Sequence, residues 1–150
     1  MKYHLVSVCD LNTITMWRNF FTKRPSPLTG APAVRRLKSY SAQSGYVYQY
    51  FYEGQRPLRS GGESGTEFVF TVSAGRKTFH PVSVLVAEGA LRAWQQAHAH
   101  PLSSTERYAV SKMALFQAFD ERATPDLMKQ EVRVRAADVA AILETLGLDN

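Results

Sequence analysis

The stretch Tyr46-Val47-Tyr48-Gln49-Tyr50-Phe51-Tyr52 gives the clearest strand signal in this sequence. Every residue in it except Gln49 favours extended backbone, and a period of two places the tyrosines on one face of a strand. Residues 66–73, Thr-Glu-Phe-Val-Phe-Thr-Val-Ser, repeat the alternation with Phe68 and Phe70 facing inward. The two stretches predict neighbouring strands of an antiparallel sheet.

Two further strand candidates flank this pair. Residues 33–40 and residues 79–86 extend it to an antiparallel β-meander over about residues 33–86. Between the central strands, Glu53–Gly65 holds four glycines, a proline and two arginines, a composition that predicts a long mobile loop. Ala74-Gly75-Arg76-Lys77 predicts a hairpin turn.

The rest of the chain reads as mostly helical. Apolar spacing predicts helices over residues 87–98, from Ser103 to about Arg122, and over residues 138–146. Ser103-Ser104-Thr105-Glu106 has the pattern of a capping box at the start of the second helix. A short strand is predicted near residues 131–135, so the order predicts an α+β fold, with about three helices packed on one face of the meander.

Pro25, Pro27, Gly30 and Pro32 interrupt the chain before the meander. They predict that residues 1–30 form an N-terminal arm or strand with a Pro-rich connector, and that residues 31–150 form a single α+β domain. A single cysteine excludes an intramolecular disulfide and favours a reducing, cytoplasmic location. No stretch approaches the roughly 20 apolar residues of a membrane span, so we expect no membrane partner.

The basic charge is concentrated in the first half of the chain. Residues 1–80 hold eleven Lys and Arg against four Asp and Glu, a net charge of +7, whereas residues 81–150 hold seven against nine, a net charge of −2. This asymmetry favours an anionic partner for one face, such as nucleic acid or an acidic protein.

The tyrosine face and the basic residues around it together form the candidate site. Tyrosine rings can stack on bases while cations hold phosphates, so we expect a non-catalytic binding module for an anionic partner, with single-stranded nucleic acid as one form of it. This expectation requires the tyrosine face to be accessible to solvent. The predicted contacts are Arg35, Arg36, Lys38, Tyr46, Tyr48, Tyr50, Tyr52, Arg56 and Arg59.

Three other interpretations remain open at this point. The tyrosines can pack beneath the helices, or they can form a protein interface in a homo-oligomer. The domain can also be a small-molecule-binding domain or a small enzyme with a pocket between sheet and helices, and its polar lining would then come from Tyr48, Tyr50, Arg56, His80 and Lys112. The sequence shows no catalytic motif, metal-ligand spacing or cofactor fingerprint, so we predict no catalytic residue, metal or cofactor.

Overall fold

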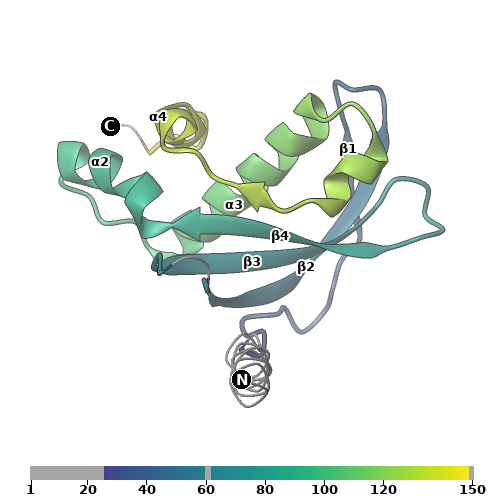
Figure 1. The fold of residues 1–150 in the computed structure, drawn as a ribbon, viewed down its shortest axis with the longest axis horizontal. Helices are drawn as coiled ribbons and strands as arrows, with labels where there is room; N and C mark the ends of the chain where they lie inside the picture. Colours follow the sequence, from purple (N-terminus) through teal and green to yellow (C-terminus); the bar gives the residue numbers. More distant parts are fainter. Residues whose placement is uncertain (1–25, 60–61, 149–150) are drawn as a thin grey trace, which may run out of the picture.

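A computed structural model describes residues 26–59 and 62–148 of the chain (Figure 1). The fold is α+β: a curled, mostly antiparallel sheet carries its helices on one face. Most of the predicted N-terminal arm or strand, residues 1–25, lies outside the described residues.

Five strands form one sheet in the order β1-β2-β3-β4-β5. The first four are an antiparallel meander in chain order, and β5 adds to β4 in parallel. Their bounds are β1 Lys38–Ser41, β2 Val47–Pro57, β3 Gly65–Ser73, β4 His80–Ala87 and β5 Val132–Arg133.

The prediction that Glu53–Gly65 is a loop is wrong for its first five residues and for Gly65, which begins β3. β2 continues through the first five to Pro57 and stays paired with β3, with a shift of register between Tyr52 and Gly54. Gly54 has a φ of +140°, and a Cβ there would lie 2.8 Å from the carbonyl oxygen of Thr29, which bridges to Gln55 beside it. The glycine therefore permits a bulge and a close approach of chain within a strand.

The helices follow the predicted positions closely. They are α2 Glu88–His98, α3 Ser104–Glu121 and α4 Ala136–Thr145, with a short 3-10 helix, η1, at Pro125–Lys129. The predicted capping box is present at the start of α3: the Ser103 hydroxyl accepts from the Glu106 amide at 3.1 Å, and the Glu106 carboxylate accepts from the Ser103 amide at 2.8 Å.

The hydrophobic core lies between the sheet and the three α-helices (Figure 1). From the sheet it takes the inward residues of β2, β3 and β4, including Phe68 and Phe70, as the alternation predicts. From the helices it takes residues such as Leu115 on α3 and Leu143 on α4, which have no exposed surface. Alternation along β2 places Tyr48, Tyr50 and Tyr52 on this helix-covered face.

Candidate functional site

The tyrosine face is not the open stacking platform that we expected from the sequence. Tyr48 is 0% exposed and Tyr50 is 5% exposed, while Tyr46, just before β2, is 39% exposed. The cause lies on α3, because the ring of Phe119 stacks on Tyr48 at 4.2 Å and Phe116 meets Tyr50 edge-on at 5.4 Å. The alternative in which the tyrosines pack beneath the helices is therefore correct for Tyr48 and Tyr50.

One side of α3 meets β1 and β2 along a seam that continues beyond these buried rings. Tyr108, Lys112 and Phe116 follow one another at intervals of four residues, so they share one side of the helix, and all three are half-buried. Tyr108 contacts Tyr52 with ring centroids 4.7 Å apart, and Phe116 stacks on Tyr40 of β1 at 4.4 Å.

Asp120, near the C-terminal end of α3, links this end of the helix to β1 and to Gln43. Its carboxylate accepts a hydrogen bond from the Tyr40 hydroxyl at 2.8 Å and another from the Gln43 amide at 2.8 Å. Burial, the hydrogen bond to Asp120 and the charge of that carboxylate raise the pKa of Tyr40 to about 12. This end of the seam is therefore closed by polar contacts.

At the N-terminal end of α3, the seam opens into a groove of about 510 Å³. Its walls are the segment that leads into β1, the middle of β2 and the first turns of α3. The groove is lined by Gly30, Pro32, Val34, Arg36, Lys38, Tyr50, Phe51, Tyr52, Gln55, Ser104, Thr105 and Tyr108. Four residues predicted from the sequence as binding contacts (Arg36, Lys38, Tyr50 and Tyr52) thus surround one cavity.

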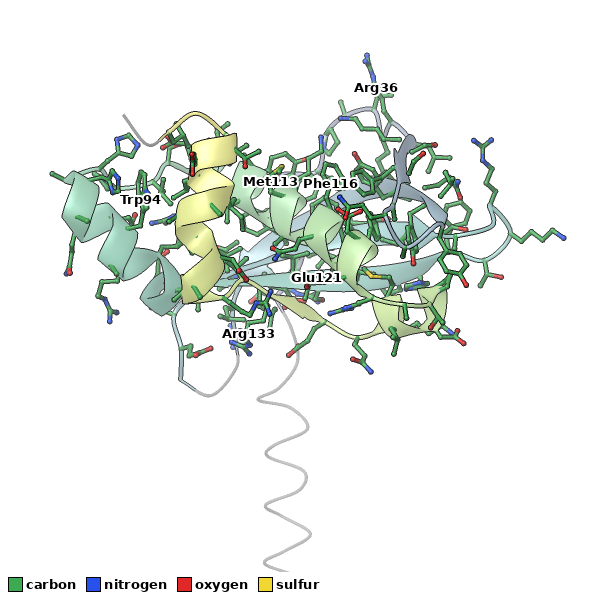
Figure 2. All side chains as sticks on the ribbon, turned by 90° about the horizontal axis from the view of Figure 1, so that it is seen from above. Arg36, Trp94, Met113, Phe116, Glu121 and Arg133 are labelled. Atoms are coloured by element: carbon green, nitrogen blue, oxygen red, sulfur yellow. The ribbon has the colours of Figure 1, made fainter. Side chains whose placement is uncertain are left out.

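Arg36 and Lys38 line this groove, and Lys112 of α3 lies next to its Tyr50 wall without being part of the lining. Among residues 26–59 and 62–148, no ion pair involves Arg36, Lys38 or Lys112. The Arg36 side chain extends outward from the segment before β1, away from the body of the fold (Figure 2). Lys38 pairs in register with Tyr50, and the Lys112 ammonium lies 6.0 Å from the centroid of the Tyr50 ring. An excess of positive charge therefore stands beside an aromatic wall.

The surroundings of Lys112 lower the pKa of its amine. Burial and, after it, a close contact with the Lys38 side chain and the charge of that side chain lower the pKa of the Lys112 amine. Two ammonium groups brought together without a carboxylate repel each other, and an anion between them would relieve that repulsion.

The predicted contacts Arg35, Arg56 and Arg59 do not line the groove. Arg35 pairs with Glu53 at 3.1 Å and Arg56 pairs with Glu67 at 2.9 Å, so their charges are already matched. Arg56 lies within β2, which contradicts the prediction that it belongs to a mobile loop. Arg59, after the strand, donates to the Ser26 hydroxyl at 3.1 Å.

The Arg56–Glu67 pair is part of a small network on the sheet. Glu67 also accepts a hydrogen bond from the Ser83 hydroxyl at 2.6 Å, so three strands contribute to it. Burial alone would raise the pKa of Glu67, but hydrogen bonds from Arg56 and Ser83 and the Arg56 charge outweigh burial and lower it. The network therefore favours the charged form of the Glu67 carboxyl and ties three strands together.

Sequence reasoning missed two members of the groove region as binding contacts. Tyr108 is absent from the predicted contacts, and Lys112 is predicted only as a polar lining residue of the alternative pocket. The spacing of Tyr108, Lys112 and Phe116 by four residues was the available signal, because it places two aromatic residues and a cation on one helix side.

The described part of the chain offers little for other kinds of site. Within residues 26–59 and 62–148, no cluster of three or more His, Cys, Asp or Glu side chains is arranged to hold a metal ion. No helix in the same residues has the length and apolar character needed to cross a bilayer. Comparison of the chain with protein-family models, with curated proteins and with solved structures finds no match.

Proposed function

We propose that the protein is a non-catalytic binding module for a small anion that carries a planar or apolar portion, held in the groove between β2, the segment before β1 and the start of α3. The observation that supports this proposal best is the set of cations without acidic partners, Arg36, Lys38 and Lys112, beside an aromatic wall. The anionic group would contact the cations of the lining, Arg36 and Lys38, and the planar portion would lie against the half-buried rings of Tyr52 and Tyr108.

The size of the groove favours a ligand of one nucleotide or less over a run of stacked bases. Small-molecule sites commonly enclose about 300–1,000 Å³, and the groove, at about 510 Å³, falls within this range. A stacking platform for a longer strand needs several accessible rings in a row, whereas Tyr48 and Tyr50 are buried against α3.

Titration calorimetry with three probes tests this proposal. Adenosine monophosphate joins a phosphate to a planar base, while adenosine and inorganic phosphate each supply one part alone. We expect the nucleotide to bind more tightly than either part, because only the nucleotide contacts both the cations and the aromatic wall. Failure of all three to bind, even at low ionic strength, contradicts the proposal.

A charge-neutralising pair of variants locates the site. Lys38→Gln removes one of the cations, and a hydrogen bond to a charged group contributes about 1.5–3 kcal/mol, so affinity should fall about tenfold or more. Lys129→Gln is the matched control, since Lys129 is exposed on η1 and pairs with Asp126 at 3.3 Å. Equal affinity of the two variants would place the anion elsewhere.

Single-stranded nucleic acid is the competing partner, and the same assay separates it. An oligothymidylate that binds tightly with a steep dependence on salt, under conditions where the mononucleotide does not bind, would favour nucleic acid and overturn the small-ligand form of the proposal. We expect the oligonucleotide to bind no more tightly than the mononucleotide.

A further inference from the structure

Gln55 lies on the helix-covered face of β2 because of the bulge at Gly54. Strict alternation from Tyr52 would place Gln55 on the opposite face of the sheet. The register shift between Tyr52 and Gly54 reverses this, because it pairs Gln55 with Phe68, whose side chain lies in the core. Residues directly opposite each other in an antiparallel pair share a face. The Gln55 side chain therefore emerges next to Tyr52, on the side of the groove that both residues line.

The bulge is of a kind that occurs beside binding sites. Gly54 has a φ of +140°, which side chains other than that of glycine rarely allow, so this bulge requires a glycine. Bulges are frequent next to functional sites, where they re-aim a side chain. The side chain that this bulge re-aims is Gln55, and its new direction is toward the groove.

The main chain and the side chain of Gln55 have different surroundings. Its N–H donates to the Thr29 carbonyl and its carbonyl accepts from the Thr29 N–H, both at 2.8 Å. Within residues 26–59 and 62–148, all hydrogen bonds of Gln55 involve its main chain. The side chain extends along Gly30, another groove residue, where an added Cβ would lie 4.0 Å from the Gln55 Nε2. The backbone is thus held in place, while the side-chain amide stands at the groove without a partner among the described residues.

An amide next to two aromatic rings suits one edge of a planar ligand. The rings of Tyr52 and Tyr108, with centroids 4.7 Å apart, offer the surface against which such a ligand lies. The Gln55 amide presents an accepting oxygen and a donating nitrogen side by side. A ring that carries an adjacent donor and acceptor forms two hydrogen bonds with this group, as adenine does with glutamine. A hydrocarbon ring would displace water from the amide without replacing its hydrogen bonds.

We propose that Gln55 selects a nucleobase as the planar portion of the ligand, by pairing its side-chain amide with an adjacent donor and acceptor on the edge of the base. This assignment rests on the proposed function, because it places the base in the groove whose cations, Arg36 and Lys38, would contact the phosphate. The ligand is then a mononucleotide, and aryl phosphates of similar size bind more weakly. In adenosine monophosphate, the exocyclic amino group donates to Oε1 and a neighbouring ring nitrogen accepts from Nε2.

Removal of one group from the nucleotide tests the inference on the wild-type protein. Purine riboside monophosphate keeps the phosphate, the ribose and the ring of adenosine monophosphate but lacks the exocyclic amino group. Titration calorimetry at one ionic strength compares the two nucleotides. We expect purine riboside monophosphate to bind about threefold to tenfold more weakly, the factor that one hydrogen bond between uncharged groups contributes. Equal affinity for the two nucleotides overturns the inference.

A variant connects the difference to the amide. Gln55→Leu keeps the backbone pairing with Thr29 but removes the donor and the acceptor, so the two nucleotides should bind it with equal affinity. Gln96→Leu is the matched control, since Gln96 is exposed on α2, and it should keep the difference of about threefold to tenfold. Circular dichroism verifies the fold of each variant. A difference that persists in Gln55→Leu overturns the inference, because another group must then contact the amino group of the base.

Failure of the base contact and failure of the anion site give different results. Binding of adenosine as tight as that of adenosine monophosphate, with weaker binding of purine riboside, supports the base contact and contradicts the anion site. Binding of adenosine monophosphate that Lys38→Gln weakens, but that is no tighter than binding of purine riboside monophosphate, supports the anion site and overturns the base contact. Absence of binding by either nucleotide overturns both.

Discussion

Removing the hydroxyl of Tyr48 should stabilise the protein. The Tyr48 side chain is fully buried, and its hydroxyl has no hydrogen-bond partner among the residues that the structure describes. An unsatisfied buried polar group costs about 1–3 kcal/mol. Tyr48→Phe removes this cost and keeps the ring that stacks on Phe119 at 4.2 Å, so the free energy of unfolding should rise by about 1 kcal/mol.

The neighbouring tyrosine supplies a matched control with the opposite sign. Tyr40 lies directly across from Tyr48 in the register of β1 and β2, but its hydroxyl donates to the Asp120 carboxylate at 2.8 Å. Tyr40→Phe loses this hydrogen bond to a charged group, which contributes about 1.5–3 kcal/mol, and the free energy of unfolding should fall by about that much.

Guanidinium denaturation followed by circular dichroism measures both changes under one set of conditions. A change of 1 kcal/mol corresponds to a shift of about 2–4 °C in melting temperature for a chain of this size, so a thermal scan provides a second readout. Destabilisation by Tyr48→Phe as large as that by Tyr40→Phe would refute the assignment of an unsatisfied hydroxyl to Tyr48.

Three further predictions concern stability. Glu67→Gln should lower the free energy of unfolding by about 1–3 kcal/mol. Because the pKa of Glu67 is lowered in the folded state, the stability that its charge contributes is present above the unfolded pKa of about 4.3 and is lost as the pH falls below it. In an acid titration the variant should therefore lose less stability than the wild type. Ser103→Ala breaks the capping box of α3 and should cost about 0.5–2 kcal/mol in chemical denaturation, with no change in helix boundaries by hydrogen exchange. Gly54→Ala places a Cβ 2.8 Å from the Thr29 carbonyl oxygen at a φ of +140°, and should destabilise the protein by more than about 1 kcal/mol, whereas Gly75→Ala, where no atom lies within 4 Å of the added Cβ, should be nearly neutral in the same assay.

Local patterns made the elements readable from the sequence. The alternation over residues 66–73 and the capping box at Ser103 depend on neighbours a few residues away, so they survive in any tertiary context. The extent of β2 could not be read in the same way. Gly54 favours a loop by composition, and only its position between Thr29 and β3 shows why a bulged strand accepts it.

The candidate site was only half predictable for a similar reason. Alternation places Tyr48, Tyr50 and Tyr52 on one face, but it cannot say which face the helices cover. That choice depends on α3, whose Phe116 and Phe119 fill the space above the tyrosines. Tyr50 and Phe116 are 66 residues apart in the chain, and Tyr48 and Phe119 are 71 residues apart, so tertiary packing and not a local pattern sets these contacts.

The position of Lys38 on β1 also affects whether the edge of the sheet can pair with another copy of the chain. β1 is the outermost strand of the sheet, four residues long, and its far edge has no partner strand among the described residues. Such an edge can template pairing with another chain. Two copies that pair antiparallel with their Lys38 residues opposite each other would bring these like charges together, and their repulsion disfavours that register. The charge of Lys38 on this edge strand therefore disfavours edge-to-edge addition of further copies.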